Sequence, residues 1–136
     1  MFKLIVGVKG TGKTKELISL CNKASEETNG CVVCVEKGNK LLHEITYTVR
    51  LVDTDEFDVA NADALYGLVA GMYASNHDIT HIFIDSALKI CLNDVDKFVA
   101  FVKLAAAFSE KNGVDFVVTS SIPAEELPED IKKYAE

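Results

Sequence analysis

Residues 7–14, with the sequence Gly-Val-Lys-Gly-Thr-Gly-Lys-Thr, match the spacing of a phosphate-binding loop, G-x-x-x-x-G-K-[ST]. Glycines allow the backbone to wrap around an anion, so that successive N–H groups and the positive end of a following helix point at it. In this pattern Lys13 can reach the β- and γ-phosphates, as a catalytic residue would, and the Thr14 hydroxyl can ligate Mg²⁺. A chance match is expected in roughly one chain in a few hundred. We therefore expect a nucleotide site made of Gly7, Val8, Lys9, Gly10, Thr11, Gly12, Lys13 and Thr14.

The segments on either side of this loop predict the elements that hold it. The apolar run 2–6 predicts a strand, and apolar residues recur at helical spacing over 13–27. The unbroken apolar run 31–35 is typical of a strand buried on both faces of a parallel sheet, and the mostly apolar segment 79–84 predicts another buried strand. Further strands are predicted at 47–52 and 114–118. Short helices are predicted at 41–45, at 87–91 and from Pro128. Two longer helices are predicted, one from Asn61 or Asp63 to about Tyr73 and one from Asn93 or Asp94 to Gly113.

The alternation of strands and helices predicts an α/β protein. We expect a single P-loop nucleotide-binding domain over residues 1–136, which is long enough to bury a sizeable core. Its fold class would be a three-layer α/β/α arrangement around a mostly parallel five-stranded sheet.

Composition and charge exclude several classes of protein. Hydrophobic residues make up 49% of the chain and charged residues 26%, as in a globular protein. The net charge of −7, from 14 basic and 21 acidic residues, argues against binding nucleic acid, which requires a basic surface. No apolar run approaches the length of a membrane span, and the early first strand leaves no room for a signal peptide. We therefore expect a cytoplasmic protein that binds neither nucleic acid nor membrane.

Two further patterns could hold a metal, but simpler explanations are favoured. Cys31 and Cys34 have the C-x-x-C spacing of zinc and redox sites, yet strand positions three apart face opposite sides, which favours reduced core cysteines. The acidic stretch 53–63 matches the spacing of no known cation-binding loop, which favours a solvated loop.

A phosphate loop of this type needs a carboxylate at the end of a neighbouring strand to hold its metal. Asp85 follows the buried strand 79–84, at the edge where ligands bind in open α/β sheets. There it can hold, through water, the Mg²⁺ that Thr14 ligates. Asp53 is a second candidate, although its strand is shorter and less apolar. The alternative role for Asp85 is to cap the following helix.

Ser86 stands where many ATPases carry the glutamate that polarises the attacking water. Either hydrolysis is slow or the base comes from another strand. Glu36 ends the strand 31–35 at the same edge of the sheet, so it is the candidate catalytic base. The alternative is an exposed glutamate that merely begins the next loop.

Three hydroxyls, those of Thr119, Ser120 and Ser121, follow the last predicted strand. Because the strand would end at the same edge, one of them could sense the γ-phosphate. The alternative is that they cap the following turn.

The order of these parts over residues 1–121 resembles a minimal RecA-type ATPase core. The resemblance implies that Glu36 is the catalytic base, that Asp85 is the magnesium-site acid and that the stretch 119–121 holds a γ-phosphate sensor. It also implies ATP and Mg²⁺ as cofactors. Short bacterial proteins described as ATP-binding, or loosely as twitching-motility-ATPase-like, are similar to this chain in length and pattern.

The chain departs from that family in several respects. It lacks DNA-contacting loops and basic surfaces, so recombinase activity is not expected. Arg50 is the only arginine and lies in a predicted strand, so the chain supplies no obvious arginine finger. Val8 stands where partitioning-type ATPases carry a signature lysine.

The RecA topology implies the strand order 48–52, 31–35, 81–85, 114–118, 2–6. The phosphate-loop strand would then lie at an edge of the sheet, where an uncovered strand can pair with another chain. We expect the C-terminal segment or a partner, either a second copy or another protein, to cover this edge.

Three functions are compatible with these features. The first is a slow Mg²⁺-dependent ATPase, since the missing arginine finger can be worth about 10³–10⁵ in rate. The second is a small nucleoside or metabolite kinase, against which the lack of an arginine-rich lid counts. The third is a non-catalytic switch, in which ATP orders the region 37–61 for a partner.

Overall fold

The computed structural model describes residues 1–135, while Glu136, the last residue of the expected domain, lies outside the described residues. The strands are β1 (Phe2–Val6), β2 (Cys31–Glu36), β3 (Arg50–Asp53), β4 (Ile79–Ile84) and β5 (Asp115–Ser120). The α-helices are α1 (Lys13–Glu27), α2 (Ala62–Ser75), α3 (Ala87–Ile90) and α4 (Val95–Asn112). The 3₁₀ helices are η1 (Thr54–Phe57), η2 (Ala124–Glu126) and η3 (Glu129–Ala135).

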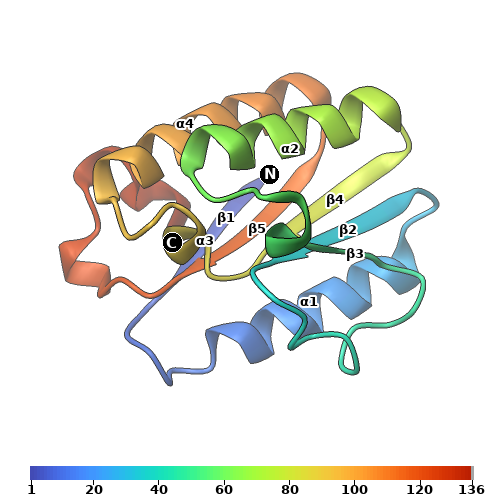
Figure 1. Cartoon of the computed structure of the whole chain (residues 1–136), viewed down its shortest axis with the longest axis horizontal. Helices are drawn as coiled ribbons and strands as arrows, with labels where there is room; N and C mark the ends of the chain where they lie inside the picture. The colour runs from blue at the N-terminus through green and yellow to red at the C-terminus, as the bar shows by residue number, and fades with distance from the viewer. Residues whose placement is uncertain (136) are drawn as a thin grey trace.

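The strands form one five-stranded sheet in the order β1-β5-β4-β2-β3, and every neighbouring pair is parallel (Figure 1). This is the order expected from the sequence, read from the opposite edge. In parallel strands the carboxyl ends meet at one edge, so the segments that follow the five strands gather on the same side of the domain. The phosphate loop, the β2–β3 connection, Asp85 and the end of β5 therefore share that side.

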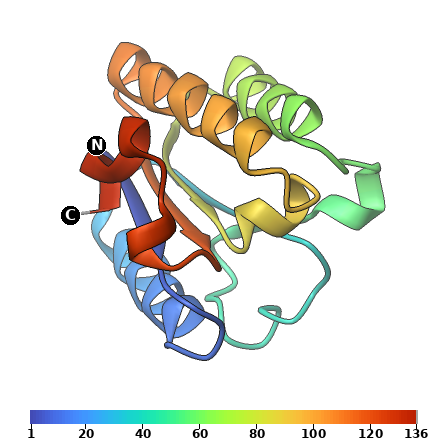
Figure 2. The same cartoon turned by 90° about the vertical axis from the view of Figure 1, so that its left-hand side faces the viewer.

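Helices cover both faces of the sheet, which confirms the three-layer prediction (Figures 1 and 2). α1 lies on one face, where its buried side chains pack against Cys34 of β2 and Phe83 of β4. α2 and α4 lie on the other face and pack against Val35 and Ile84 of the same strands. Because successive side chains of a strand point to opposite faces, these contacts fix which strand-end residues point toward α1.

Several helix ends follow the predicted capping residues. The side chain of Asn61 accepts a hydrogen bond from the Ala64 N–H at the start of α2, and Asp94 accepts one from Lys97 at the start of α4. Gly113 ends α4 with a φ of 67°, a conformation that glycine adopts without strain. Of the two capping residues weighed for each helix, Asn61 and Asp94 are the ones used.

The region 37–49 differs from the prediction. The segment 41–45 is a hydrogen-bonded turn rather than a helix, and the strand expected from residue 47 begins only at Arg50. The cause is tertiary: the Asn22 side chain on α1 donates to the Glu44 carbonyl and accepts from the Thr46 N–H. These bonds satisfy backbone groups that a longer helix or strand would have paired internally.

One strand boundary also shifts. β5 continues to Ser120, two residues beyond the predicted end, because β1 pairs with it as far as Val6 opposite Ser120. The short helix predicted from Pro128 is present as the 3₁₀ helix η3.

The outer side of β1 lies beside the C-terminal segment, shown in red in Figure 2. The Phe2 ring packs edge-to-face on the Tyr134 ring of η3, with a distance of 5.3 Å between their centroids. The Gly7 N–H donates to the Ile122 carbonyl at 2.9 Å, so the chain after β5 also holds the end of β1. The C-terminal segment thus supplies part of the cover expected at this edge.

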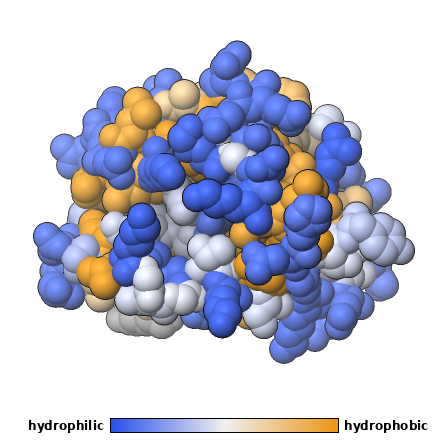
Figure 3. Space-filling view, turned by 60° about the horizontal axis from the view of Figure 1, so that its bottom comes forward, coloured by the Kyte–Doolittle hydropathy of each residue, from blue (hydrophilic) through white to orange (hydrophobic). Residues whose placement is uncertain are grey.

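Polar side chains cover much of the side of the molecule shown in Figure 3, broken by separate hydrophobic areas. Cys34 is buried, as predicted for a core cysteine, whereas Cys31 is exposed at the first position of β2, so the predicted core position is wrong for Cys31; neither cysteine forms a disulfide. Within residues 1–135, no group of three or more His, Cys, Asp or Glu side chains could hold a metal ion. In the same part of the chain, no helix is both long and apolar enough to cross a membrane.

Candidate functional site

The loop 7–12 connects the end of β1 to the first residue of α1. Gly10 and Gly12 have φ angles of 87° and 86°, which glycine adopts readily and other residues rarely do. Gly12 is also the N-cap residue of α1, so the loop ends at the positive end of a 15-residue helix. The sequence pattern therefore produces the strand–loop–helix geometry that an anion site requires.

The side chains of the loop bond to its own backbone. Lys13 Nζ and Thr11 Oγ1 each donate to the Val8 carbonyl at 2.8 Å. The Lys13 ammonium is thus folded back onto the loop. Residues 8–12 are exposed, while Lys13 and Thr14 are half-buried.

Asp85 lies next to Thr14, although 71 positions separate them in the sequence. The Thr14 hydroxyl is 3.1 Å from Asp85 Oδ1 and 3.3 Å from Oδ2. The Asp85 side chain is only 8% exposed, and its N–H donates to the Val35 carbonyl of β2. A hydroxyl and a carboxylate are the oxygen ligands that Mg²⁺ prefers, so this pair is chemically suited to the predicted metal site.

The alternatives for these carboxylates are resolved by their contacts. Ser86, not Asp85, is the N-cap residue of α3, so the helix-cap alternative is wrong. Asp53 accepts hydrogen bonds from the Asp55 and Gly38 N–H groups and caps η1. The Asp53 carboxylate therefore binds the backbone N–H groups of Gly38 and Asp55, whereas the Asp85 carboxylate contacts Thr14 of α1, the helix that follows the loop.

Glu36 lies at the end of β2, beside Asp85 at the end of β4. Val35 is opposite Ile84 in the register, so the next residues, Glu36 and Asp85, are neighbours across the two strands. Strand alternation places both carboxylates on the α1 face, since Cys34 and Phe83 pack on that side. The structure therefore brings the candidate base and the candidate metal acid together at one edge.

The Glu36 side chain is 3% exposed, so the alternative of an exposed glutamate is wrong. Its Oε2 accepts a hydrogen bond from the Leu41 N–H at 2.9 Å. Burial raises the pKa of this carboxyl above its usual value, and the nearby charges of Asp85 and Asp53 raise it further. The backbone N–H groups of Leu41 and Lys40 lower the pKa without cancelling that rise.

The three hydroxyls at the end of β5 have different surroundings. Thr119 is buried and donates to Asp85 Oδ1 at 2.7 Å. Ser120 is also buried, but alternation places it on the face opposite α1, where its hydroxyl donates to the Thr119 carbonyl. Ser121 is exposed in the turn that follows. Of the predicted stretch, only Thr119 contacts another residue of the candidate site.

Two contacts of the site had no counterpart in the sequence prediction. The Ser86 N–H donates to Thr119 Oγ1 at 2.8 Å, with Ser86 in the left-handed conformation. The bond from Gly7 to the Ile122 carbonyl anchors the start of the loop. Alternation along β5 shows that Thr119 and Ser120 face opposite sides, but both faces of the strand are buried, so the sequence does not say which hydroxyl faces α1, and nothing in it marks the backbone contacts.

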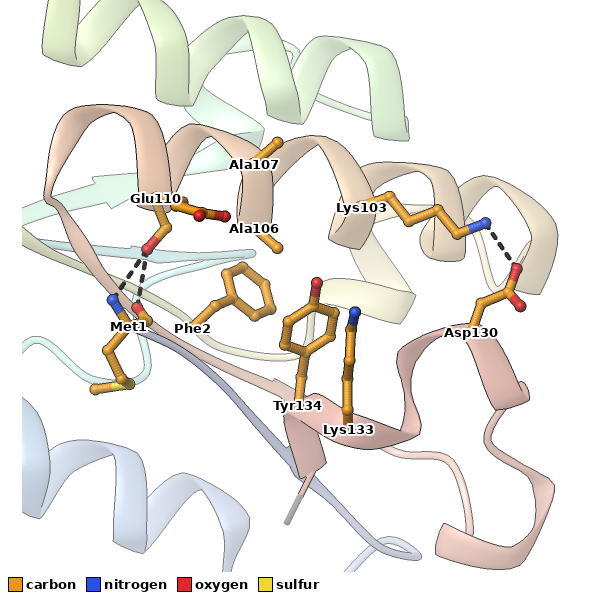
Figure 4. Close-up of a pocket in the computed structure, with 10 residues that line it drawn as sticks. Met1, Phe2, Lys103, Ala106, Ala107, Glu110, Asp130, Lys133 and Tyr134 are labelled. Carbon is orange, nitrogen blue, oxygen red and sulfur yellow. Dashed lines mark hydrogen bonds and ion pairs between the residues drawn. The ribbon is translucent and has the colours of Figure 1, made fainter.

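Two hollows of about 550 Å³ each lie away from this site. One lies between α4, β1 and η3 and is lined by Phe2, Tyr134 and the Lys103–Asp130 ion pair (Figure 4). The other lies between α2 and α4. The loop residues, Asp85 and Glu36 line neither hollow. The candidate site is instead an exposed loop with two buried carboxylates beside it.

Comparison with known proteins places the fold. No protein-family model matches the sequence, and no curated protein matches it. Among solved structures, the chain is similar to a KaiC-like protein from the hyperthermophilic archaeon Pyrococcus horikoshii OT3, with a TM-score of 0.71 and 20% sequence identity. The match covers 98% of this chain but 66% of that protein, so the chain spans less than two thirds of its length. The likeness confirms the predicted RecA-like α/β fold with an all-parallel five-stranded sheet.

Proposed function

We propose that this chain binds ATP with Mg²⁺ through Gly7–Thr14 and hydrolyses it slowly. The observation that carries the proposal is the contact between Thr14 and Asp85, at 3.1 Å. It joins Thr14, which follows the loop, to a strand-end carboxylate two strands away in the sheet. The fold shared with the KaiC-like protein is consistent with a nucleotide-binding domain.

In this proposal each residue has a separate role. The N–H groups of the loop and the Lys13 ammonium bind the phosphates, and the Lys13 charge stabilises negative charge that develops on the γ-phosphate. Thr14 and Asp85 hold Mg²⁺, which would neutralise charge on the phosphate oxygens. Glu36 accepts a proton from the attacking water; its raised pKa makes it a stronger base than an ordinary carboxylate.

Two features support slow turnover. Ser86 follows Asp85, so no second carboxylate stands directly after the metal acid. Arg50, the only arginine, is exposed at the start of β3, the end of the strand away from the loop. A partner that supplied an arginine would raise the rate by about 10³–10⁵.

A switch function is the second candidate, and one contact favours it. Glu36 bonds directly to the Leu41 N–H, which links the nucleotide side of β2 to the turn 41–45. A nucleotide that drew Glu36 away from Leu41 would rearrange this turn, which is part of the region 37–61 that ATP would order for a partner in a switch.

The wider proposal treats residues 1–136 as one nucleotide-binding unit that acts in the cytoplasm and binds no nucleic acid. It places the chain with short bacterial ATP-binding proteins of the kind loosely called twitching-motility-ATPase-like. A second copy or another protein would bind at the edge of β1, beside the C-terminal segment.

Phosphate release from Mg²⁺–ATP, measured with and without a panel of nucleosides, tests the proposal. We expect slow release that needs no acceptor and is lowered about 10²–10⁴-fold by Glu36→Gln, with ATP binding retained. ADP formation only in the presence of an acceptor would instead identify a kinase. Tight binding without turnover would identify the switch.

A further inference from the structure

The Thr119 hydroxyl joins the ends of two neighbouring strands. Thr119 is in β5 and Asp85 follows β4, and the register of Ile84 opposite Val118 brings them side by side. The hydroxyl donates to Asp85 Oδ1 at 2.7 Å and accepts from the Ser86 N–H at 2.8 Å. Thr119 is 1% exposed, so water does not compete for these bonds.

The chemistry of a hydroxyl limits what Thr119 can do. A threonine has one proton to donate and two lone pairs to accept with. Here the proton is directed at Asp85, and one lone pair accepts from Ser86. A γ-phosphate oxygen is itself an acceptor and requires a donor, so Thr119 could contact it only by releasing Asp85. These bonds argue against a direct phosphate contact.

The same bonds fix the orientation of the Asp85 carboxylate. Oδ1 receives the short bond from Thr119 as well as one from Thr14 at 3.1 Å. Oδ2 has only longer contacts, 3.3 Å to Thr14 and 3.4 Å to the Ser86 hydroxyl. Thr119 therefore holds Oδ1 in place and leaves Oδ2 as the oxygen with capacity for another ligand. By binding the Ser86 N–H it also fixes the turn into α3, where Ser86 has a φ of 57°.

We propose that Thr119 is a positioning residue that orients Asp85 for Mg²⁺ and does not bind the nucleotide. The inference rests on the proposed function, because it concerns the metal of that site. It predicts that loss of the hydroxyl changes the response to Mg²⁺ and leaves metal-free nucleotide binding unchanged. Groups that orient metal ligands are typically worth about 10–100-fold in metal affinity or activity.

The test compares Thr119→Val, which keeps the side-chain shape, with the wild type. ATP binding is measured in EDTA, and turnover is measured over a Mg²⁺ titration. We expect Thr119→Val to raise the half-saturating Mg²⁺ concentration about tenfold or more and to leave ATP affinity in EDTA unchanged. Thr80→Val serves as the matched control, because Thr80 lies in β4 at the end of the sheet away from the loop.

A second pair of variants covers the case in which Thr119→Val does not fold. Thr119→Ser and Thr119→Ala both lose the methyl group and differ only by the hydroxyl. We expect the serine variant to keep a Mg²⁺ response within about threefold of the wild type and the alanine variant to lose it.

Equal Mg²⁺ responses in these two variants would overturn the inference, as would a wild-type response in Thr119→Val. So would weaker ATP binding in EDTA with an unchanged Mg²⁺ response, which would make Thr119 a phosphate contact. A wild-type protein that binds no Mg²⁺–ATP would overturn the proposed function and this inference together.

Discussion

Glu36 is the residue whose proposed chemistry has the clearest cost in stability. Glu36 is 3% exposed and lies beside Asp85 and Asp53 on the neighbouring strands. Burial and these charges raise its pKa in the folded protein above the ordinary value of 4.5. The stability linked to such a group is fully present below its unfolded pKa and is lost as the pH rises through the folded pKa. At neutral pH the ionised Glu36 therefore destabilises the native state.

Two substitutions separate the charge from the hydrogen bond. Glu36→Gln removes the charge but keeps an oxygen that can accept from the Leu41 N–H, which Glu36 binds at 2.9 Å. Glu36→Ala removes both and leaves that N–H unpaired in a residue that is 2% exposed. An unsatisfied buried donor costs about 1–3 kcal/mol, so the alanine variant should be less stable than the glutamine variant by about this amount. For a domain of this size each kcal/mol shifts the melting temperature by about 3–5 °C.

Urea unfolding followed by circular dichroism between pH 8 and pH 4.5 measures both effects. Glu36→Gln should be more stable than the wild type at pH 8, and the difference should shrink as the pH falls toward 4.5, because the wild-type carboxyl becomes protonated. A difference that stays constant with pH, or a glutamine variant no more stable than the wild type at pH 8, would refute the argument from burial and charge. Equal stability of the alanine and glutamine variants would refute the role of the Leu41 contact.

Two further substitutions test the scaffold. Gly30→Ala would place a Cβ 2.3 Å from the Asp78 carbonyl oxygen, so it should lower the free energy of unfolding by about 1–3 kcal/mol. Gly67→Ala is the control: Gly67 lies on the exposed side of α2 with no atom within 4 Å, so this substitution should raise the free energy of unfolding by about 0.5–1 kcal/mol. No loss of stability in Gly30→Ala would contradict the packing at the start of β2. Tyr134→Ala removes the ring that packs on Phe2, so it should cost about 0.5–1.5 kcal/mol and speed amide exchange across β1; unchanged exchange would show that η3 does not protect this edge.

Apolar segments in the sequence placed the individual strands, and the resemblance to the RecA topology supplied their order in the sheet. The sequence also placed Thr14 and Asp85 together, since loop and strand end must meet at one edge. It did not predict the turns at 41–49. The apolar residues there suggest helix and strand, but bonds from Asn22 on α1 decide the backbone, and such contacts leave no local pattern.

The candidate site was predictable to the same extent. Side-chain alternation places Glu36, Asp85 and Thr119 on the α1 face, but these strands are buried on both faces, so the sequence alone does not say which face α1 covers. The burial of Glu36 and the direction of the Thr119 proton depend on distances between strands and could not be predicted. The sequence therefore identified the stretch 119–121 without separating its one site-facing hydroxyl from the other two.

Calorimetric titration of Mg²⁺–ATP into the wild-type chain, Lys13→Ala and Lys15→Ala tests the central claim most directly. Lys15 is the matched control, because it is an exposed lysine of α1 outside the loop pattern. Loss of the Lys13 charge should weaken binding by about 1.5–3 kcal/mol, roughly ten- to hundredfold, with an unchanged circular dichroism spectrum, while Lys15→Ala should bind like the wild type. Wild-type affinity in Lys13→Ala, or no binding by the wild type, would contradict the claim that Gly7–Thr14 is a nucleotide site.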